Sequence, residues 1–241
     1  MASHSGDYLE TLPMPDWMAA HRGESLALEL DSDDGIAWNL DAWEAAFSRS
    51  EWQALWPRFE TVSSWSVDGY IRRMTLLQEA RLIDSGDALT LHIGAMVWGV
   101  GSTTGRNRAN VAKGLKDSNA PVKMSRLFEA LRTSGFSIEI FNRIGRKGDL
   151  GLPGLGSSFA TKTLYFMGFG LDHSADLRPL ILDMVVARAL RETAPAFPKY
   201  PGFRRKWYSS YVRLAQRWGD ELGFPTRPDV IEYLLFWHGK Q

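Results

Sequence analysis

The feature that most constrains this chain is a short, stiff bend placed directly before an apolar segment with helical periodicity. Residues 152–168 read LPGLGSSFATKTLYFMG, where a proline precedes Gly154 and Gly156, which flank a leucine. Glycines are needed where a backbone turns tightly or approaches another molecule closely. Ser157 and Ser158 are preferred N-cap residues, so we expect them to start a helix whose first amides point outward unpaired. The bend therefore predicts two helices joined by a tight hairpin.

The rest of the chain also favours helices. Its 241 residues, 44% of them hydrophobic, suffice for one domain of two lobes or for two small domains. SIEIFNRIG, at residues 137–145, favours a strand by propensity, but its amphipathic period leads more naturally into the hairpin as a helix. No internal repeat and little β-hairpin signal are present, so the predicted fold class is mainly α. Helices are expected at 39–59, 68–86, 88–102, 121–133, 157–167, 184–191, 203–223 and 227–240.

Charge is distributed unevenly along the chain although the formal net charge is zero. Residues 1–50 carry ten Asp or Glu against two Arg, whereas residues 101–147 carry ten Lys or Arg against three acids. Residues 188–217 carry eight Lys or Arg against one acid. Two basic blocks predict a face that meets phosphate, with acidic surface elsewhere. The alternative interpretation is that these charges only solvate helix faces.

Composition excludes several classes of site. The chain has no cysteine, which excludes disulfides, thiolate zinc sites, iron–sulfur clusters and a cysteine nucleophile. The five histidines are scattered, so we expect no metal bound by side chains. No apolar stretch approaches the roughly 20 residues of a membrane span, and MASHSGDYLE lacks a signal pattern. We expect a cytoplasmic protein without a membrane partner.

Asp183 is the residue with the clearest chemical potential. It follows an apolar run in RPLILDMVVARAL and directly precedes a segment of helical period. Its ordinary role would be an N-cap worth about 1 kcal/mol. A carboxylate at a helix start is also held ionised by the dipole, and it can stabilise positive charge on a sugar or activate a water. Cleavage of a glycosidic bond needs such a carboxylate, because the transition state is oxocarbenium-like.

Together these segments resemble the helix-hairpin-helix DNA glycosylase superfamily, and within it the bacterial 8-oxoguanine DNA glycosylase-like branch. The resemblance rests on GLGSSFATKTLYFMG, on PLILDMVVARAL and on the final RPDVIEYLLFWHGK. It implies a mainly α, two-lobed fold with a DNA-binding cleft between the lobes. Residues 71–170 would form a central lobe ending in the helix-hairpin-helix, and residues 41–70 with 171–241 a terminal lobe. Residues 1–40 would be an acidic irregular leader.

The resemblance also implies roles for individual residues. Asp183 matches the essential aspartate of the superfamily. Leu152, Gly154, Leu155 and Gly156 match its DNA-binding hairpin, whose backbone carbonyls hold a monovalent cation in relatives. No other cofactor is implied.

One departure from the superfamily concerns the nucleophile. Bifunctional relatives, which also nick the strand, place a lysine two residues after the second hairpin glycine, where this chain has Ser158. Serine cannot form the Schiff base that nicking requires. Lys162 lies one helical turn further on, where it would contact a phosphate or serve as the alternative nucleophile. We therefore expect a monofunctional hydrolase in which Asp183 activates water.

An enzyme that acts on a base must flip it out of the duplex into a pocket. We expect Trp98, in AMVWGVGSTTGRNR, to line this pocket, core packing being the alternative, with Phe236 and Trp237 on the facing wall. The expected contacts to the DNA backbone, besides the hairpin, are Ser157, Ser158, Lys147, Arg106 and Arg108.

The predicted function is that of a DNA glycosylase, acting on double-stranded DNA with a modified base. Base flipping and hydrolysis of the N-glycosidic bond would leave an abasic site. The resemblance implies either repair of oxidised guanine or antiviral defence against phages with hypermodified bases, such as glucosylated hydroxymethylcytosine. The alternative is a helix-hairpin-helix protein that binds DNA without catalysis. The sequence identifies neither the excised base nor a protein partner.

Overall fold

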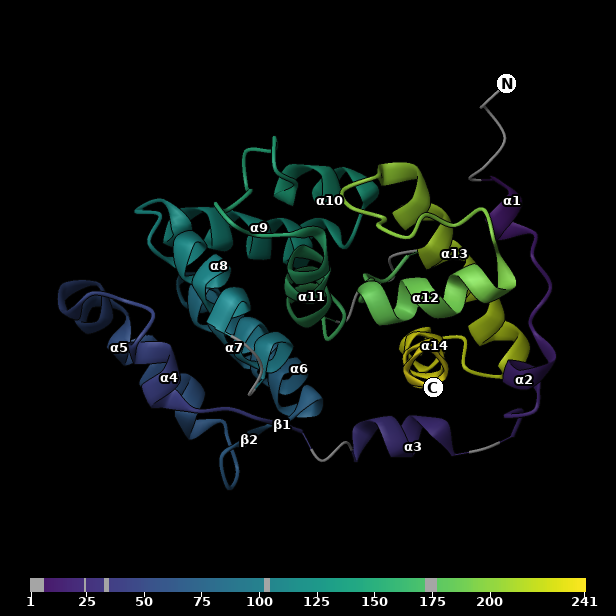
Figure 1. Cartoon of the computed structure of the whole chain (residues 1–241), viewed down its shortest axis with the longest axis horizontal. Helices are drawn as coiled ribbons and strands as arrows, with labels where there is room; N and C mark the ends of the chain where they lie inside the picture. The colour runs from purple at the N-terminus through teal and green to yellow at the C-terminus, as the bar shows by residue number, and fades with distance from the viewer. Residues whose placement is uncertain (1–6, 24, 33–34, 102–104, 172–176) are drawn as a thin grey trace.

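The computed structural model describes residues 7–23, 25–32, 35–101, 105–171 and 177–241. Over these ranges the chain forms fourteen α-helices, one 3-10 helix and one small sheet (Figure 1). In that sheet β1 (Ile36–Ala37) pairs antiparallel with β2 (Tyr70–Ile71). The mainly α fold class is therefore confirmed. The division into two lobes with a cleft stays a prediction.

From residue 73 onward, most of the helices follow the predicted segments. An exception is α8, which forms in the polar, basic stretch where no helix was expected. The helices are α6 (Arg73–Leu82), α7 (Ala88–Val100), α8 (Gly105–Leu115), α9 (Ala120–Ser134), α10 (Ile138–Ile144), α11 (Ser157–Gly168), α12 (Met184–Thr193), α13 (Arg205–Leu222) and α14 (Asp229–Lys240), with the 3-10 turn η1 (Ser85–Asp87) before α7.

The segment expected to be an irregular leader contains three short helices: α1 (Asp7–Glu10), α2 (Asp16–Ala19) and α3 (Leu26–Asp31). Its apolar residues Leu9, Met18 and Leu30 are buried in the common hydrophobic core. Figure 1 shows this segment running past α13 and α14. The acidic composition of this segment suggested an irregular structure. Burial of its apolar side chains instead holds it against the core.

Two predicted helices begin elsewhere than expected. Residues 39–59 form α4 (Leu40–Glu44) and α5 (Arg49–Ser64), because Ser48 starts a second helix with a capping box. In it the Glu51 carboxylate accepts a hydrogen bond of 2.7 Å from the Ser48 amide. Asp68 does not cap α6: it lies in a turn, with φ of 53°, before β2.

Helix α7 lies in the core and packs against several other helices. It is buried along almost its whole length and packs against α5, α9 and α11. In Figure 1, α11 lies between the group of α6 to α9 and the helix α12. Helices α12 and α14 pack closely, since a Cβ on Gly239 would lie 2.3 Å from the Val185 carbonyl oxygen. These contacts hold α11 against α7 and α12 against α14.

A buried histidine joins α7 to α11. His92 Nδ1 lies 3.0 Å from Thr163 Oγ1, whose hydroxyl donates to the Phe159 carbonyl oxygen at 3.0 Å. Because the hydroxyl hydrogen is used there, His92 Nδ1–H is the donor to Thr163. Burial lowers the pKa of His92 from 6.5 to about 4, so the imidazole is neutral in the native state.

This histidine makes stability depend on pH. Between pH 6.5 and pH 4 the unfolded chain binds a proton that the native state does not, so stability is lost as pH falls through this window. We expect His92 alone to cost about 3 kcal/mol of the free energy of unfolding by pH 4. Urea unfolding at several pH values measures it, with His92→Gln as the control that cannot titrate. An unchanged slope in His92→Gln would contradict the assignment.

Candidate active site

The hairpin between α10 and α11 is anchored on α8. Gly154 adopts φ of 76°, and a Cβ there would lie 2.3 Å from the Asn110 carbonyl oxygen of α8. Leu152 and Leu155 are buried on either side, and the Leu155 amide donates to the Leu152 carbonyl at 3.2 Å. The sequence LPGLG therefore forms a tight turn whose leucines face the core and whose second glycine, Gly156, is exposed.

The helix after the hairpin begins one residue earlier than the serines suggested. Gly156 is the N-cap of α11, with no side-chain cap, so the prediction that Ser157 or Ser158 caps the helix is wrong. The reason is that Gly156 adopts the extended N-cap conformation and its carbonyl accepts from the Ala160 amide at 2.9 Å. A Cβ on Gly156 would meet no atom within 4 Å. The uncapped helix start thus borders open space, where an anion can approach the amides.

Asp183 is the N-cap of α12, as its position in the sequence predicted. Its Oδ1 accepts hydrogen bonds from the amides of Val185 (2.9 Å) and Val186 (3.1 Å), which leaves Oδ2 for other partners. Burial alone would raise the pKa of the Asp183 carboxyl. The Lys162 ammonium and these amides outweigh burial and hold that pKa below its ordinary value. Asp183 is therefore an anion at neutral pH.

The partner of the free Asp183 oxygen is Lys162 on α11. Lys162 Nζ lies 3.3 Å from Asp183 Oδ2 and 3.2 Å from Ser158 Oγ, and the lysine side chain is only 7% exposed. Gly99 makes room for it, because a Cβ there would lie 2.7 Å from Lys162 Cδ. The expected use of Lys162 as a phosphate contact does not fit this burial, since phosphates of bound DNA stay at the surface.

A hydrogen bond from α11 to the segment just before α12 helps to position Lys162 and Asp183. The hydroxyl of Thr161, next to Lys162, accepts from the amide of Leu182, next to Asp183, at 3.1 Å. Thr161 Oγ1 also lies 3.0 Å from the Ser158 carbonyl oxygen, to which it donates. The ammonium and the carboxylate are therefore held in register by backbone positions and not only by their own attraction.

Lys162 and Asp183 line a pocket of about 240 Å³ together with the three predicted base-pocket residues, Trp98, Phe236 and Trp237. We call this cavity the base pocket. Trp98 also packs edge-on against Phe166, with ring centroids 5.1 Å apart, so both interpretations of Trp98 describe part of its surroundings. The remaining residues around the base pocket are Ile36, Arg73, Gly99, Ile181, Glu232, Tyr233 and Lys240.

Asp183 also lines a second hollow, of about 280 Å³, which we call the hairpin groove. Gly154, Gly156, Ser157 and Ser158 line this groove, as do Asn110, Phe159, Leu182, Met184, Tyr200, Pro201 and Gly202. Asp183 thus lines both the hairpin groove and the base pocket.

Three predicted phosphate contacts lie apart from these two hollows. Arg106 and Lys147 are exposed and Arg108 is half-buried, and none of them lines the groove or the base pocket. Arg106 stands one helical turn before Asn110, which lines the groove. Arg146, which the sequence did not single out, lines a further hollow of about 620 Å³ beside the hairpin.

The structure brings one ion pair to the base pocket that sequence patterns missed. Arg73 Nη1 donates to Glu232 Oε2 at 2.7 Å, and both residues are almost fully buried. Burial alone would lower the pKa of Arg73, but Glu232 raises it above its ordinary value. Burial raises the pKa of Glu232, against the opposing effect of Arg73. Charged residues inside the apolar runs of α6 and α14 were the available signal, but long-range pairing cannot be inferred from one sequence.

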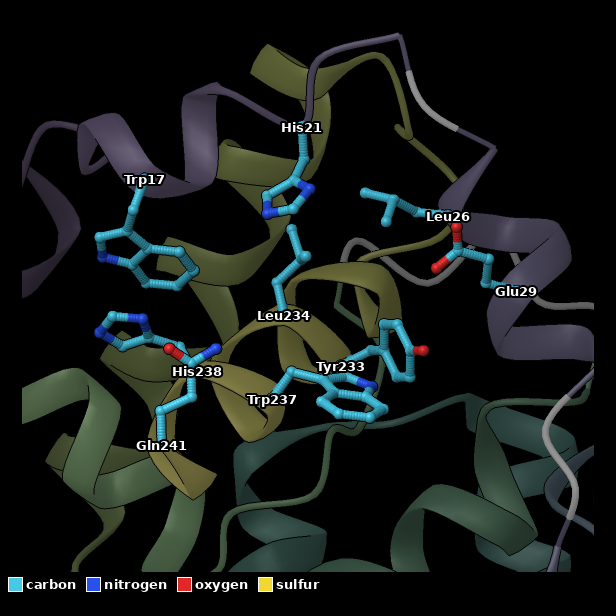
Figure 2. Close-up of a pocket in the computed structure, with 9 residues that line it drawn as sticks. All are labelled: Trp17, His21, Leu26, Glu29, Tyr233, Leu234, Trp237, His238 and Gln241. Atoms are coloured by element: carbon cyan, nitrogen blue, oxygen red, sulfur yellow. The ribbon is translucent and has the colours of Figure 1, made fainter.

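A larger pocket, of about 490 Å³, adjoins the outer part of α14 and shares Tyr233 and Trp237 with the base pocket. Figure 2 shows Trp17 of α2 lying flat against His238, with ring centroids 4.0 Å apart and planes at 4°. His238 Nε2 is 2.6 Å from a carboxylate oxygen of Glu192 on α12. The amino-terminal helices thus help to hold the helix that carries one wall of the base pocket.

Among the residues that the structure describes, no three His, Asp or Glu side chains are grouped to hold a metal ion. Nor does the described part of the chain contain a helix of the length and apolarity that a membrane crossing needs. At the start of the hairpin, the Gly151 carbonyl oxygen accepts a hydrogen bond of 3.0 Å from Lys123 Nζ. The monovalent cation expected at the other hairpin carbonyls stays a prediction.

Comparison with known proteins gives one match. The model of the family described as "Putative 8-oxoguanine DNA glycosylase OGG-like protein" matches residues 32–236, which include the hairpin, Lys162 and Asp183. Neither a curated protein nor a solved structure matches the chain.

The hairpin geometry predicts different effects at its two glycines. Gly154→Ala would place a side chain in the left-handed region and against the Asn110 carbonyl, so we expect a loss of about 1–3 kcal/mol in the free energy of unfolding. Gly156→Ala, at a position with open space, is the matched control and should change it by less than about 0.5 kcal/mol. Urea denaturation measures both. Equal losses would contradict this description of the hairpin.

Proposed function

We propose that this chain, which belongs to the OGG-like 8-oxoguanine DNA glycosylase family, excises a modified base from double-stranded DNA and leaves an abasic site. The observation that carries the proposal is the position of Asp183. Asp183 lines both the hairpin groove and the base pocket, so a sugar between a bound phosphate and a flipped base would lie against this residue.

The hairpin is proposed to bind the DNA backbone. The first amides of α11 have no side-chain cap, and the helix dipole places partial positive charge on them. Gly156 leaves the approach to these amides open. Arg146 and Lys147 add exposed positive charge just before the hairpin, and Arg106 adds it on α8, the helix on which the hairpin is anchored. Such contacts position DNA without selecting a sequence, as an enzyme that searches for damaged or modified bases requires.

The base pocket is proposed to receive the flipped base. Trp98, Phe236 and Trp237 supply aromatic surface on which a base can stack, in a pocket that is partly open to solvent. Stacking interactions of this kind repay part of the cost of unpairing, which is a few kcal/mol. A base that is already weakly paired is therefore the easiest to extrude.

Hydrolysis is the proposed reaction. The bond from C1′ to the base nitrogen breaks, its electron pair leaves with the base, and positive charge develops on the sugar. The Asp183 carboxylate stabilises this charge and takes a proton from the water that adds to C1′. Lys162 keeps the carboxylate ionised before the reaction, and the departing base receives a proton from solvent.

A second candidate for the nucleophile is Lys162 itself. Its amine is buried in the base pocket and lies 3.3 Å from Asp183, which could accept its proton. Attack of the free amine on C1′ would form a Schiff base and would allow strand cleavage. Burial of Lys162 at this place favours this candidate over the phosphate contact first expected.

Two biological uses are proposed for the same chemistry: repair of oxidised guanine and defence against phages with hypermodified bases. A panel of duplexes distinguishes them, with 8-oxoguanine, 5-hydroxymethylcytosine or its glucosylated form at one position. Abasic sites are revealed by alkali, which breaks the strand there. Binding without breaks in any duplex would favour the alternative, a non-catalytic DNA-binding protein.

Replacing the central carboxylate tests catalysis directly. Asp183→Asn keeps an oxygen for the N-cap bonds but removes the negative charge, so we expect a fold close to wild type and excision slowed by about 100-fold or more. Single-turnover rates on the fastest duplex of the panel measure it. Binding to a duplex with an abasic analogue should be retained. Asp149→Asn, on an exposed aspartate, is the control. Unchanged excision in Asp183→Asn would remove the assignment.

Borohydride trapping separates the two nucleophiles. With water as the nucleophile, we expect no covalent protein–DNA adduct when borohydride is added during the reaction. An adduct that Lys162→Ala abolishes, and that Lys113→Ala on α8 retains, would instead identify Lys162 as the nucleophile and overturn hydrolysis.

A further inference from the structure

Part of the base pocket is polar, and the reaction described above does not use it. Arg73, Trp98 and Glu232 all line the pocket, and Arg73 and Glu232 are 4% and 1% exposed. Burying a guanidinium and a carboxylate costs several kcal/mol per ion before their attraction is counted, so their presence beside Lys162 and Asp183 needs an explanation.

The Arg73 guanidinium is held from several directions. Its Nη1 donates to Glu232 Oε2 at 2.7 Å and to the Tyr165 hydroxyl at 3.3 Å. Its Cζ lies 5.2 Å from the ring centroid of Trp98 and 5.1 Å from that of Tyr165. The Tyr165 hydroxyl in turn donates to Asp229 Oδ2 at 3.1 Å. Arg73 is therefore a fixed cation, in contact with a wall of the base pocket.

Two donors on these residues have no acceptor. Arg73 Nε and Trp98 Nε1 are both buried, and neither has a hydrogen-bond partner among the described residues. An unpaired buried N–H costs about 1–3 kcal/mol, and native proteins contain few of them. Arg73 and Trp98 contact each other and both line the base pocket, which makes a ligand in this pocket the common candidate acceptor for the two N–H groups.

The chemistry of the departing base explains what these donors are for. When the bond to C1′ breaks, the base gains an electron pair, which it delocalises onto its carbonyl oxygens and ring nitrogens. Hydrogen bonds to those atoms strengthen as negative charge develops, so they stabilise the transition state more than the bound substrate. A neighbouring guanidinium adds fixed positive charge.

We propose that Arg73 Nε–H and Trp98 Nε1–H bind acceptor atoms of the extruded base and stabilise the negative charge that it carries on leaving. This inference rests on the proposed function and deepens it. It specifies a substrate base with a carbonyl oxygen or an unprotonated ring nitrogen on the edge that enters the pocket. Asp183 and Arg73 then act on opposite partners of the breaking bond, the sugar cation and the base anion.

Trp98→Phe tests the proposal because it keeps an aromatic ring beside Phe166 and Arg73 and removes the unpaired N–H, together with two ring carbons. The melting temperature should fall only slightly, since no protein hydrogen bond is lost and only the packing of part of the indole ring is missing. The single-turnover rate of excision, at saturating enzyme and on the duplex from which wild type removes the base fastest, should fall about tenfold or more. Binding to a duplex with an abasic analogue should not change, because that duplex has no base to contact.

Trp43→Phe is the matched control. Trp43 Nε1 is also buried without an acceptor among the described residues, but Trp43 packs on Phe59 and is not among the residues that line the base pocket. The same substitution there should leave the excision rate unchanged. Arg73→Lys, which keeps a cation for Glu232 but lacks the Nε donor, should slow excision as Trp98→Phe does.

The outcomes separate this inference from the proposed function. An unchanged rate in Trp98→Phe, or an equal loss of binding to the abasic duplex, would overturn the inference while wild-type excision stands. Equal slowing by Trp43→Phe would also overturn it, since the effect would then be structural. If wild type excises a base from none of the duplexes, the proposed function fails, and the inference fails with it.

Discussion

The contact between Lys162 and Asp183 is the interaction on which the rest of the site depends. Asp183 is bound through one carboxylate oxygen to two amides of α12 and through the other to an ammonium on α11. Each bond favours the ionised form, and together they outweigh the effect of burial on the Asp183 pKa. An anion is thus held at a residue that lines both hollows, and its side chain is 17% exposed.

That position is maintained by packing well beyond the two side chains. The Thr161–Leu182 hydrogen bond joins the chain at Lys162 to the chain at Asp183. Helix α11 is fixed on α7, in part through His92 and Thr163, and α12 is fixed on α14 through the close approach at Gly239. The elements that bring the carboxylate, the amine and the aromatic walls together are therefore rigid helices, which is what a preorganised site requires.

Local signals in the sequence predicted a large part of this arrangement. An aspartate before a helical period is an N-cap, and the structure has Asp183 there. The bend at Gly154 needed a residue tolerant of positive φ, and it turns as the sequence indicated. Trp98, Phe236 and Trp237 meet at one cavity, as the family resemblance implied, although their roles stay proposals.

What could not be predicted depends on contacts between distant parts of the chain. Arg73 and Glu232 are ordinary charged residues in the sequence, and only the fold, in which α6 packs on α11 and Glu232 of α14 meets Arg73, makes them a buried pair. The sequence predicted an irregular acidic leader at the amino terminus, but Leu9 and Met18 of this segment are buried in the core. The sequence favoured a serine as the N-cap of α11, but in the structure Gly156 is the N-cap. At each of these places, contacts in the folded chain decide the structure, and local sequence preferences do not.

The most direct test of the central claim is a crystal structure of the wild-type protein bound to a duplex with an abasic-site analogue. We expect one phosphate on the first amides of α11 and the Asp183 carboxylate within about 3.5 Å of C1′ of the analogue sugar, as a near-attack arrangement requires. The same structure should leave the base pocket facing that sugar. DNA bound on another face, or a sugar whose C1′ is remote from Asp183, would contradict the account.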